Sequence, residues 1–295
     1  MSWRYRRWLS VGSARAASYQ TQFGTSKLAN ANQPAGAGCA PAARAITYDT
    51  SGFVASQTDF NGIQTTYVNN ARGLETSRTE AAGTPLARTV TTAWHATLRQ
   101  PTQIDEPGRR TTFTYDTSGN PLAKTVTDTA SGIARTWTWT YNAQGQMLTA
   151  DGPRTDVLDK TTYTYYATST GSVTAGDLAT VTDAQGYVTQ VTAYDRHGRP
   201  LTIIDPNSVT TTLAYTPRGW LQSRTVAGQA TTYTYDAVGQ LTRVTLGDGS
   251  HTDYSYDAAH RLTSVTDTLG RAVDYTLDNA GNRIGTHWQN NDLHL

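Results

Sequence analysis

The sequence predicts an all-β fold of tandem β-hairpins that join into one continuous twisted β-strip. Threonine supplies 54 of the 295 residues and tyrosine 17, and both residue types favour strands. Glycine (25) and aspartate (20) favour turns, whereas glutamate occurs only at Glu75, Glu80 and Glu106. Turn signals recur about every ten residues, and the short stretches between them suit strands of about five residues.

The overall composition excludes several classes of protein. Every apolar run is too short for a membrane helix, so no transmembrane helix is expected. A net charge of +1 is too balanced for a dedicated nucleic-acid binder. Cys39 is the single cysteine, which rules out an internal disulfide. The hydrophobic fraction of 37% also predicts a thin core for this length.

The first 45 residues differ from the rest, because they hold six Lys or Arg and no acidic residue. We expect residues 1–45 to form a basic, poorly ordered leader that ends in the flexible linker 36–41. The alternative is a signal peptide, but residues 9–13 do not make an apolar core for one. The expected boundaries are therefore a leader at 1–45, a repeat region at 46–284 and a C-terminal tail at 285–295.

The main signal is an internal repeat with the pattern Tyr-Asp-x-x-Gly. From Tyr194 onward its starts fall at 194, 215, 235, 256 and 277. Variant forms lie at 67–73, 215–219 and 256–260, the last with His260 in place of glycine. The residues that we predict to carry the motif are Tyr48, Asp49, Gly52, Tyr115, Asp116, Gly119, Tyr141, Asn142, Gly145, Tyr194, Asp195, Gly198, Tyr235, Asp236, Gly239, Tyr256, Asp257, Asp278 and Gly281.

A weaker turn signal alternates with this motif. It is found at 58–62, 104–108, 182–186, 204–207, 246–249 and 266–270. Two turn signals per repeat of about twenty residues indicate one hairpin per repeat. Residues 75–103 and 151–180 keep the threonine-rich composition but blur the period, so we interpret them as degenerate repeats with longer loops.

The repeat at 235–241 shows how one hairpin is built. Asp236 can accept a backbone amide two residues on, and Gly239 can take the left-handed conformation that closes a type I turn with a bulge. Leu241 then faces Tyr235 on one side of the sheet, and Thr234 pairs with Thr242 on the other. Val244 falls on the threonine side in this register, so either a bulge or a sheet with two mixed faces is possible.

Tyr-Asp-x-x-Gly units in this order and spacing resemble the YD repeats of the Rhs family, which includes bacterial polymorphic toxins, toxin-complex shells and the animal teneurins. The resemblance covers roughly residues 46–284. It implies that the strip is part of a hollow shell around a toxic C-terminal segment. It also implies adjacent Rhs repeats and a core, the toxin cargo and a secretion-system component as partners, and a secreted or cell-surface location.

The sequence departs from the toxin members of that family near its end. Their core carries Asp-Pro-x-Gly, whereas here Asp205-Pro206 precedes Asn207 within an ordinary repeat, so we expect the core and toxin regions to be missing from these residues. The chain therefore looks like a piece of a shell.

No catalytic or metal-binding motif stands out. Ser250, His251, Asp248 and Asp253 supply the residue types of a triad, but they are packed into one turn. The six histidines lack close ligand spacing, and the aspartates occur once per turn, so we expect no metal and no cofactor. Aromatic side chains could form a stacking platform for sugars or the buried face of strands, namely Trp137, Trp139, Tyr163, Tyr165 and Tyr166.

Two functions remain open. The first is a non-catalytic shell segment that helps enclose or present a secreted toxin in intercellular competition. The second is a cell-surface binding module that recognises a carbohydrate or a protein through one face of the strip. Buried aromatics would favour the first function, and aromatics along an open groove would favour the second.

Overall fold

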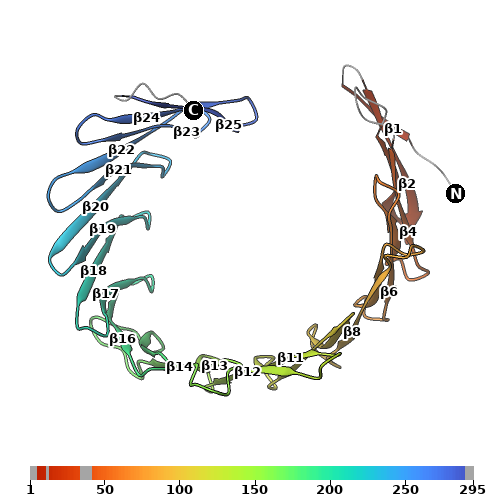
Figure 1. Ribbon diagram of the computed structural model, residues 1–295, viewed down its shortest axis with the longest axis horizontal. Coiled ribbons are helices and arrows are strands. Elements are labelled where there is room, and N and C mark those ends of the chain that lie inside the picture. The colour runs from red at the N-terminus through yellow and green to blue at the C-terminus, as the bar shows by residue number, and fades with distance from the viewer. Residues whose placement is uncertain (1–4, 11–12, 34–41, 290–295) are drawn as a thin grey trace. The chain divides into compact units, whose positions relative to one another are not determined.

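The computed structural model describes residues 5–10, 13–33 and 42–289. The chain divides into two compact units, Met1–Asp159 and Lys160–Leu295. Within each unit every strand pairs antiparallel with the next strand along the chain, as in a meander (Figure 1). The predicted all-β class is confirmed. None of the described residues form a helix that could cross a membrane.

The strands of the first unit are short except near its start. They are β1 (Tyr5–Ser10), β2 (Ser13–Gln22), β3 (Thr25–Gln33), β4 (Ala42–Tyr48), β5 (Val54–Thr58), β6 (Gln64–Asn69), β7 (Glu75–Glu80), β8 (Arg88–Trp94), β9 (Pro101–Glu106), β10 (Arg109–Tyr115), β11 (Pro121–Asp128), β12 (Ala134–Tyr141) and β13 (Met147–Asp151).

The strands of the second unit follow the sequence period most regularly. They are β14 (Lys160–Tyr165), β15 (Leu178–Thr182), β16 (Val188–Tyr194), β17 (Pro200–Ile204), β18 (Thr210–Tyr215), β19 (Leu221–Val226), β20 (Gln229–Tyr235), β21 (Leu241–Thr245), β22 (His251–Tyr256), β23 (Leu262–Asp267), β24 (Ala272–Leu277) and β25 (Arg283–Trp288).

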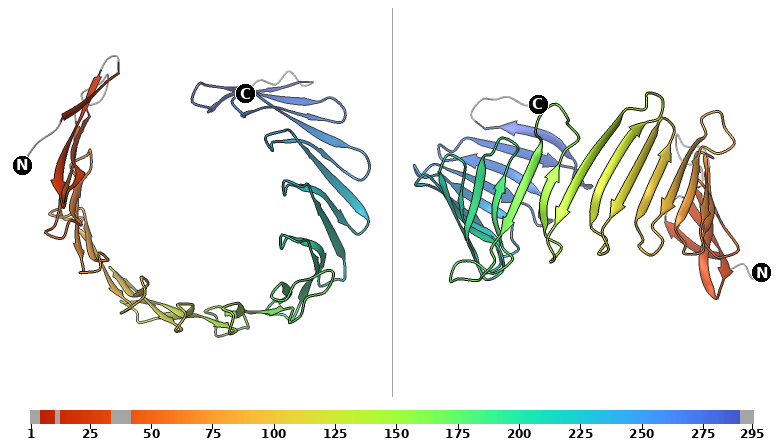
Figure 2. Two further views of the ribbon diagram at one scale, coloured as in Figure 1. Left: turned by 180° about the vertical axis from the view of Figure 1, so that it is seen from behind. Right: turned by 90° about the horizontal axis from the view of Figure 1, so that it is seen from below.

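Each unit is a single-layered sheet (Figure 2). Its two faces carry different side chains. On the aromatic face of the second unit, Tyr233 lies opposite Val244 and Tyr235 opposite Leu241. The threonine face carries pairs of hydroxyl groups across neighbouring strands. These pairs are Thr47 with Ser56 (2.7 Å), Thr79 with Thr89 (2.9 Å), Thr125 with Thr136 (2.9 Å), Thr140 with Thr149 (2.7 Å), Thr164 with Thr180 (2.6 Å) and Thr234 with Thr242 (3.2 Å).

A bulge beside each Tyr-Asp turn keeps these faces separate. The register shifts between Thr234 and Tyr235, so that Tyr235 faces Leu241 while Thr234 faces Arg243. Val244 therefore returns to the aromatic face, opposite Tyr233. The bulge, not a mixed sheet, is the correct one of the two alternatives at Val244.

The core is thin, because a single layer can bury little. Among the described residues, the apolar side chains that are buried are Leu74, Val90, Val173, Val191 and Ala272. Most of the aromatic face is only half-buried, as the alternating exposure along β12 and β20 shows. The sheet is therefore held together mainly by strand pairing and by its turns.

The two ends of the chain differ from the sequence prediction. Strands β2 and β3 lie inside the expected leader and form a hairpin around Phe23 and Gly24, both at positive φ. The expected boundary at residue 45 falls within β4, and β25 runs four residues into the expected tail. Those expectations were based on charge and composition. In the structure β4 pairs with β3 and β24 pairs with β25, so strand pairing extends the sheet beyond both expected boundaries. The linker at 36–41 lies outside the described residues.

Candidate functional site

The predicted Tyr-Asp-x-x-Gly residues meet in one kind of turn. In the turn 236–239, the Asp236 amide donates to the Gln240 carbonyl (3.0 Å) and the Gly239 amide to the Asp236 carbonyl (3.3 Å). Oδ1 of Asp236 accepts the amides of Val238 (3.0 Å) and Gln240 (2.9 Å). Gly239 has a φ of +98°. In the same way, Oδ1 of the first turn residue accepts the backbone amide four residues on in the turns at Asp49, Asp116, Asn142, Asp195, Asp257 and Asp278.

The motif tyrosine links its hairpin to the preceding one. The backbone ladder between β19 and β20 ends at the pair Ser223–Thr232, before it reaches Leu221. The hydroxyl of Tyr235 donates to the Leu221 carbonyl across this gap (2.9 Å). The same bond joins Tyr48 to Leu28 (2.9 Å), Tyr115 to Pro101 (2.7 Å), Tyr194 to Leu178 (2.7 Å) and Tyr256 to Leu241 (3.0 Å). Burial raises the pKa of Tyr115, Tyr194, Tyr235 and Tyr256.

Degenerate repeats use other side chains for the same bonds. The indole of Trp94 donates to the Glu75 carbonyl (2.7 Å), and the amide of Asn69 donates to the Val54 carbonyl (3.2 Å). His95 takes the aspartate's place, because its Nδ1 accepts the Leu98 amide (3.1 Å). Sequence reasoning missed these residues. Spacing to the glycine could have found Asn69, since Asn69 and Gly73 are as far apart as Tyr235 and Gly239.

Successive Tyr-Asp turns also pack against one another. A Cβ atom placed on Gly239 would lie 2.6 Å from the Trp220 ring, and one on Gly73 would lie 2.6 Å from the Phe53 ring. Trp220 and Phe53 each follow the glycine of the preceding turn. We call this row of turns the YD edge of each unit. Gly73 and Gly239 are thus required both by backbone conformation and by the space that the neighbouring side chain takes, whereas Gly198 has no atom within 4 Å of a Cβ position and is required by conformation alone.

Most turns at the opposite edge do not touch in this way. Among the described glycines of these turns, a Cβ atom on Gly247 would lie 2.8 Å from Gln229 Oε1, but one would have no atom within 4 Å at Gly62, Gly108, Gly132, Gly186, Gly228, Gly249 and Gly270. Close packing between turns is therefore more frequent at the YD edge, as at Gly73 and Gly239, although an open depression of about 500 Å³ lies on that edge between the turns 236–239 and 257–260.

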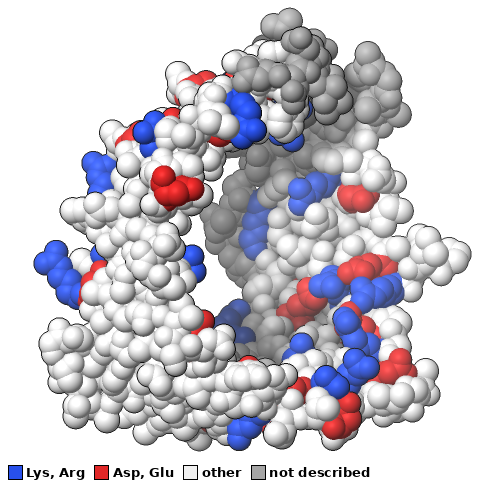
Figure 3. All heavy atoms as spheres, turned by 60° about the vertical axis from the view of Figure 1, so that its left-hand side comes forward, with Lys and Arg blue, Asp and Glu red and all other residues white. Residues whose placement is uncertain are grey.

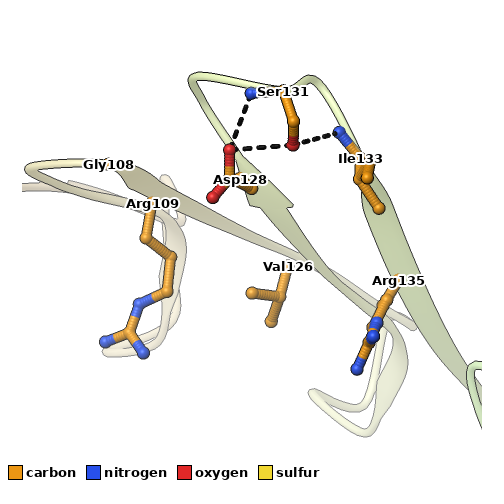
Figure 4. A pocket seen from close by; sticks show the side chains of 7 residues that line it. All are labelled: Gly108, Arg109, Val126, Asp128, Ser131, Ile133 and Arg135. Atoms are coloured by element: carbon orange, nitrogen blue, oxygen red, sulfur yellow. Dashed lines mark hydrogen bonds between the residues drawn. The ribbon is translucent and has the colours of Figure 1, made fainter.

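One open depression of about 390 Å³ lies at this opposite edge, between β10, β11 and β12. Asp128 accepts the amide (2.7 Å) and hydroxyl (2.9 Å) of Ser131, while Arg109, Val126 and Arg135 project to one side of the strands (Figure 4). Arg109 is bonded to Glu106. The depression combines charged and apolar side chains, and the Ser131 hydroxyl in it is engaged by the Asp128 carboxylate of its own turn.

All three glutamates of the chain belong to one ion-pair network on β7 to β10. Arg78 bonds Glu75 (3.2 Å) and Glu80 (3.0 Å), and Arg88 bonds Glu80 (3.1 Å) and Glu106. The hydrogen bond from Arg88 lowers the pKa of Glu80. On the face shown in Figure 3, positive and negative side chains lie next to one another, without a large area of either sign.

The other candidate residues do not form a reactive centre. The Ser250 hydroxyl donates to Asp248 (2.6 Å), whereas the His251 ring lies near Asp253 (3.7 Å) and Thr268 (3.3 Å). The serine therefore bonds the Asp248 carboxylate and not the His251 ring, so the three residue types do not line up as in a triad. Among the described side chains, no three His, Cys, Asp or Glu gather as a metal site would require.

The candidate stacking residues are half-buried on the aromatic face of their respective units. Trp137 and Trp139 belong to β12, with Lys124 Nζ 5.3 Å from the Trp137 ring centre. Tyr163 and Tyr165 belong to β14. Tyr166 instead donates its hydroxyl to the Val191 carbonyl (2.9 Å). These side chains are therefore neither fully buried nor fully exposed to solvent.

Comparison with known families agrees with this repeat geometry. The RHS Repeat family matches residues 174–210, 194–232, 215–251, 235–272 and 256–287. Four of these five segments begin at a motif tyrosine: Tyr194, Tyr215, Tyr235 and Tyr256. Residues 174–287 therefore carry RHS repeats, and the predicted resemblance is confirmed over this part of the chain. A search of curated protein sequences finds no match.

Solved structures share the fold at low sequence identity. The crystal structure of TcdB2-TccC3-Cdc42 has a TM-score of 0.59 and 17% identity, and that of TcdB2-TccC3 has 0.58 and 18%. TcdB2-TccC3 without its hypervariable C-terminal region gives 0.59 and 17%. Each match covers 93% of this chain but 15% of the other chain, so this chain spans a small part of those proteins.

The tyrosine bond gives a first prediction. Tyr235→Phe should lower the free energy of unfolding by about 0.5–1.5 kcal/mol, because the Leu221 carbonyl loses its donor. Tyr233→Phe is the control, since Tyr233 lies on the same face without such a bond. Urea denaturation measures both changes, and equal losses would contradict the role of the hydroxyl.

The turn glycine gives a second prediction. Gly239→Val should cost about 1–3 kcal/mol or more, because a β-branched residue is strained at positive φ and would also meet Trp220. His260→Val should cost less, since His260 already holds a side chain at a φ of +63°. Chemical denaturation of the two variants tests this order, and a reversed order would refute the assignment.

The aspartate caps give a pH prediction. The Arg199 side chain lowers the pKa of Asp195 to about 2. A lowered pKa stabilises the fold above the unfolded value near 4, and this stabilisation is lost as the pH falls toward 2. Arg199→Gln should therefore flatten the decline in stability between pH 5 and about 2, as measured by urea denaturation. Arg196→Gln, in the same turn, should leave the profile unchanged.

The expectation that the chain needs no metal gives a further prediction. We expect thermal melting curves with EDTA, with calcium and without either to coincide, because each aspartate cap already serves its own turn. Differential scanning calorimetry would measure this. A rise of several degrees with calcium would show that a site has been missed.

Proposed function

We propose that this chain is a non-catalytic segment of an Rhs-type shell that helps enclose or present a secreted toxin in competition between cells. The RHS repeats and the fold shared with TcdB2-TccC3 support the proposal. Its partners are then adjacent repeats and a core, the enclosed cargo and a secretion component. Its location is outside the producing cell or at its surface.

The observation that carries the proposal is the half-buried aromatic face. In the second unit this face runs through Tyr233, Tyr254 and Val265 without a second layer from the described residues of that unit. A large apolar face gains free energy when something covers it. A cargo polypeptide held against the strip supplies such a cover, while the threonine face stays in water.

An unfolded probe tests which face holds the cargo. Fluorescein-labelled, carboxymethylated α-lactalbumin should bind the full chain, as measured by fluorescence anisotropy. Tyr254→Ser should weaken this binding several-fold, whereas Thr266→Ser on the threonine face should not. Absence of binding, or equal loss in both variants, would contradict the proposal.

The second candidate function is recognition of a carbohydrate at a cell surface. The partial exposure of Trp137 and Trp139 favours it, because flat aromatic side chains stack on sugar rings. Glycan-array binding that is lost in Trp139→Ser, together with no binding of the unfolded probe, would support this function over the shell.

A further inference from the structure

Cations without an anionic partner lie on the aromatic face of the second unit. Cross-strand partners share a face of the sheet, as do alternate residues of one strand. Arg224 pairs with Thr231, two residues before Tyr233, so it lies on the aromatic face. Arg283 lies on the same face, with its guanidinium 5.0 Å from the centre of the Tyr275 ring. Neither guanidinium makes a hydrogen bond or an ion pair with another described residue.

The aromatic face of the first unit carries such cations as well. Lys124 pairs with Trp137 and lies over its ring, and Arg135 pairs with Val126 on the same face. Neither of these cations bonds a carboxylate of the described residues. Asp128 lines the same depression as Arg135, but its carboxylate is bonded to the amides and the hydroxyl of its own turn.

The acidic side chains of the strands are either engaged or on the other face. On the aromatic face, each glutamate bonds at least one arginine, and Asp267 bonds Arg271. Lys160, which alternates with Thr162 and Thr164 on β14, is a free cation on the threonine face. That face also carries the strand aspartates, which are Asp105, Asp151, Asp253 and Asp274. The free positive charge of the described strands thus lies mainly on the aromatic faces.

A cover over the aromatic face would remove water from these cations. A charge that is buried without a partner of opposite sign costs free energy, and this cost would offset the gain from covering the apolar side chains. A cover that supplies carboxylates avoids the cost. The cations are separated by apolar and aromatic side chains, as Arg224 is by Leu213 and Tyr233, so the carboxylates of the cover must be spaced among apolar groups.

We propose that the aromatic face binds an acidic polypeptide in which aspartate or glutamate alternates with apolar residues. Its carboxylates pair with cations such as Arg224 and Arg135, and its apolar side chains cover rings such as Tyr254. The inference rests on the shell proposal, because it specifies the chemistry of the cargo that the strip holds.

Fluorescence anisotropy with two labelled peptides tests the inference. The peptides have equal length and identical apolar residues, and they carry either aspartate or lysine at every other position. The full chain should bind the aspartate peptide at least tenfold more tightly than the lysine peptide at low salt. Added NaCl should reduce this difference, because salt screens the charges. Equal affinity for the two peptides would overturn the inference.

Arg224→Glu and Lys160→Glu form a matched pair of variants. Each reverses one exposed, free cation of the second unit, but the two cations lie on opposite faces. Arg224→Glu should weaken binding of the aspartate peptide several-fold, whereas Lys160→Glu should leave it unchanged. Equal losses would show that only the net charge of the chain matters and would contradict a site on the aromatic face. Circular dichroism melting verifies that both variants fold.

Two further outcomes separate the inference from its alternatives. Heparin carries anionic groups without apolar side chains, so unlabelled aspartate peptide should compete better than heparin for the labelled one. Stronger competition by heparin would assign the face to an anionic polysaccharide and overturn the inference. Binding of carboxymethylated α-lactalbumin, together with equal affinity for the two peptides, would leave the shell proposal standing without this inference. Absence of binding by every polypeptide would refute both.

Discussion

The hydrogen bond from a motif tyrosine to the carbonyl of the neighbouring hairpin is the contact on which the sheet depends most. An isolated hairpin is marginal in water, and this chain has little core to stabilise one. The backbone ladder between hairpins stops short of the YD edge, as at Ser223 and Thr232. The hydroxyl of Tyr235 donates to the Leu221 carbonyl, which lies beyond the end of this ladder. The repeat length of about twenty residues follows, because each hairpin must return a tyrosine to that edge.

The aspartate and glycine of the motif serve this contact by fixing the turn and the bulge. Asp236 holds the amides of the turn, and the bulge after it turns Leu241 and Val244 to the tyrosine's side. One face of the sheet thereby becomes aromatic and the other becomes threonine-rich. A sheet of this kind has one face suited to water and one that gains from a cover, as the proposed shell role requires.

The sequence predicts the contacts within a turn, because their residues are close along the chain. It does not predict which side chain replaces a motif residue when the bonding partner is far away in the sequence. The cap at Asp236, the left-handed Gly239 and the pairing of Thr234 with Thr242 follow from residues close in sequence. The replacement of tyrosine by Trp94 depends on a carbonyl nineteen residues away. The ion pairs from Arg88 to Glu80 and Glu106 likewise depend on strand register. No spacing rule indicates either, and the hairpin turn Phe23–Gly24 has Phe23 at a positive-φ position where Asn, Asp or Gly is usual.

Hydrogen–deuterium exchange along the second unit tests the central claim most directly. Tyrosine hydrogen bonds and packed turns join neighbouring hairpins at the YD edge. Backbone amides there should therefore exchange more slowly than those at the opposite edge. Peptides covering 235–241 and 256–262 should therefore exchange more slowly than those covering 245–251 and 266–272. Equal exchange at both edges, or faster exchange at the YD edge, would contradict the account.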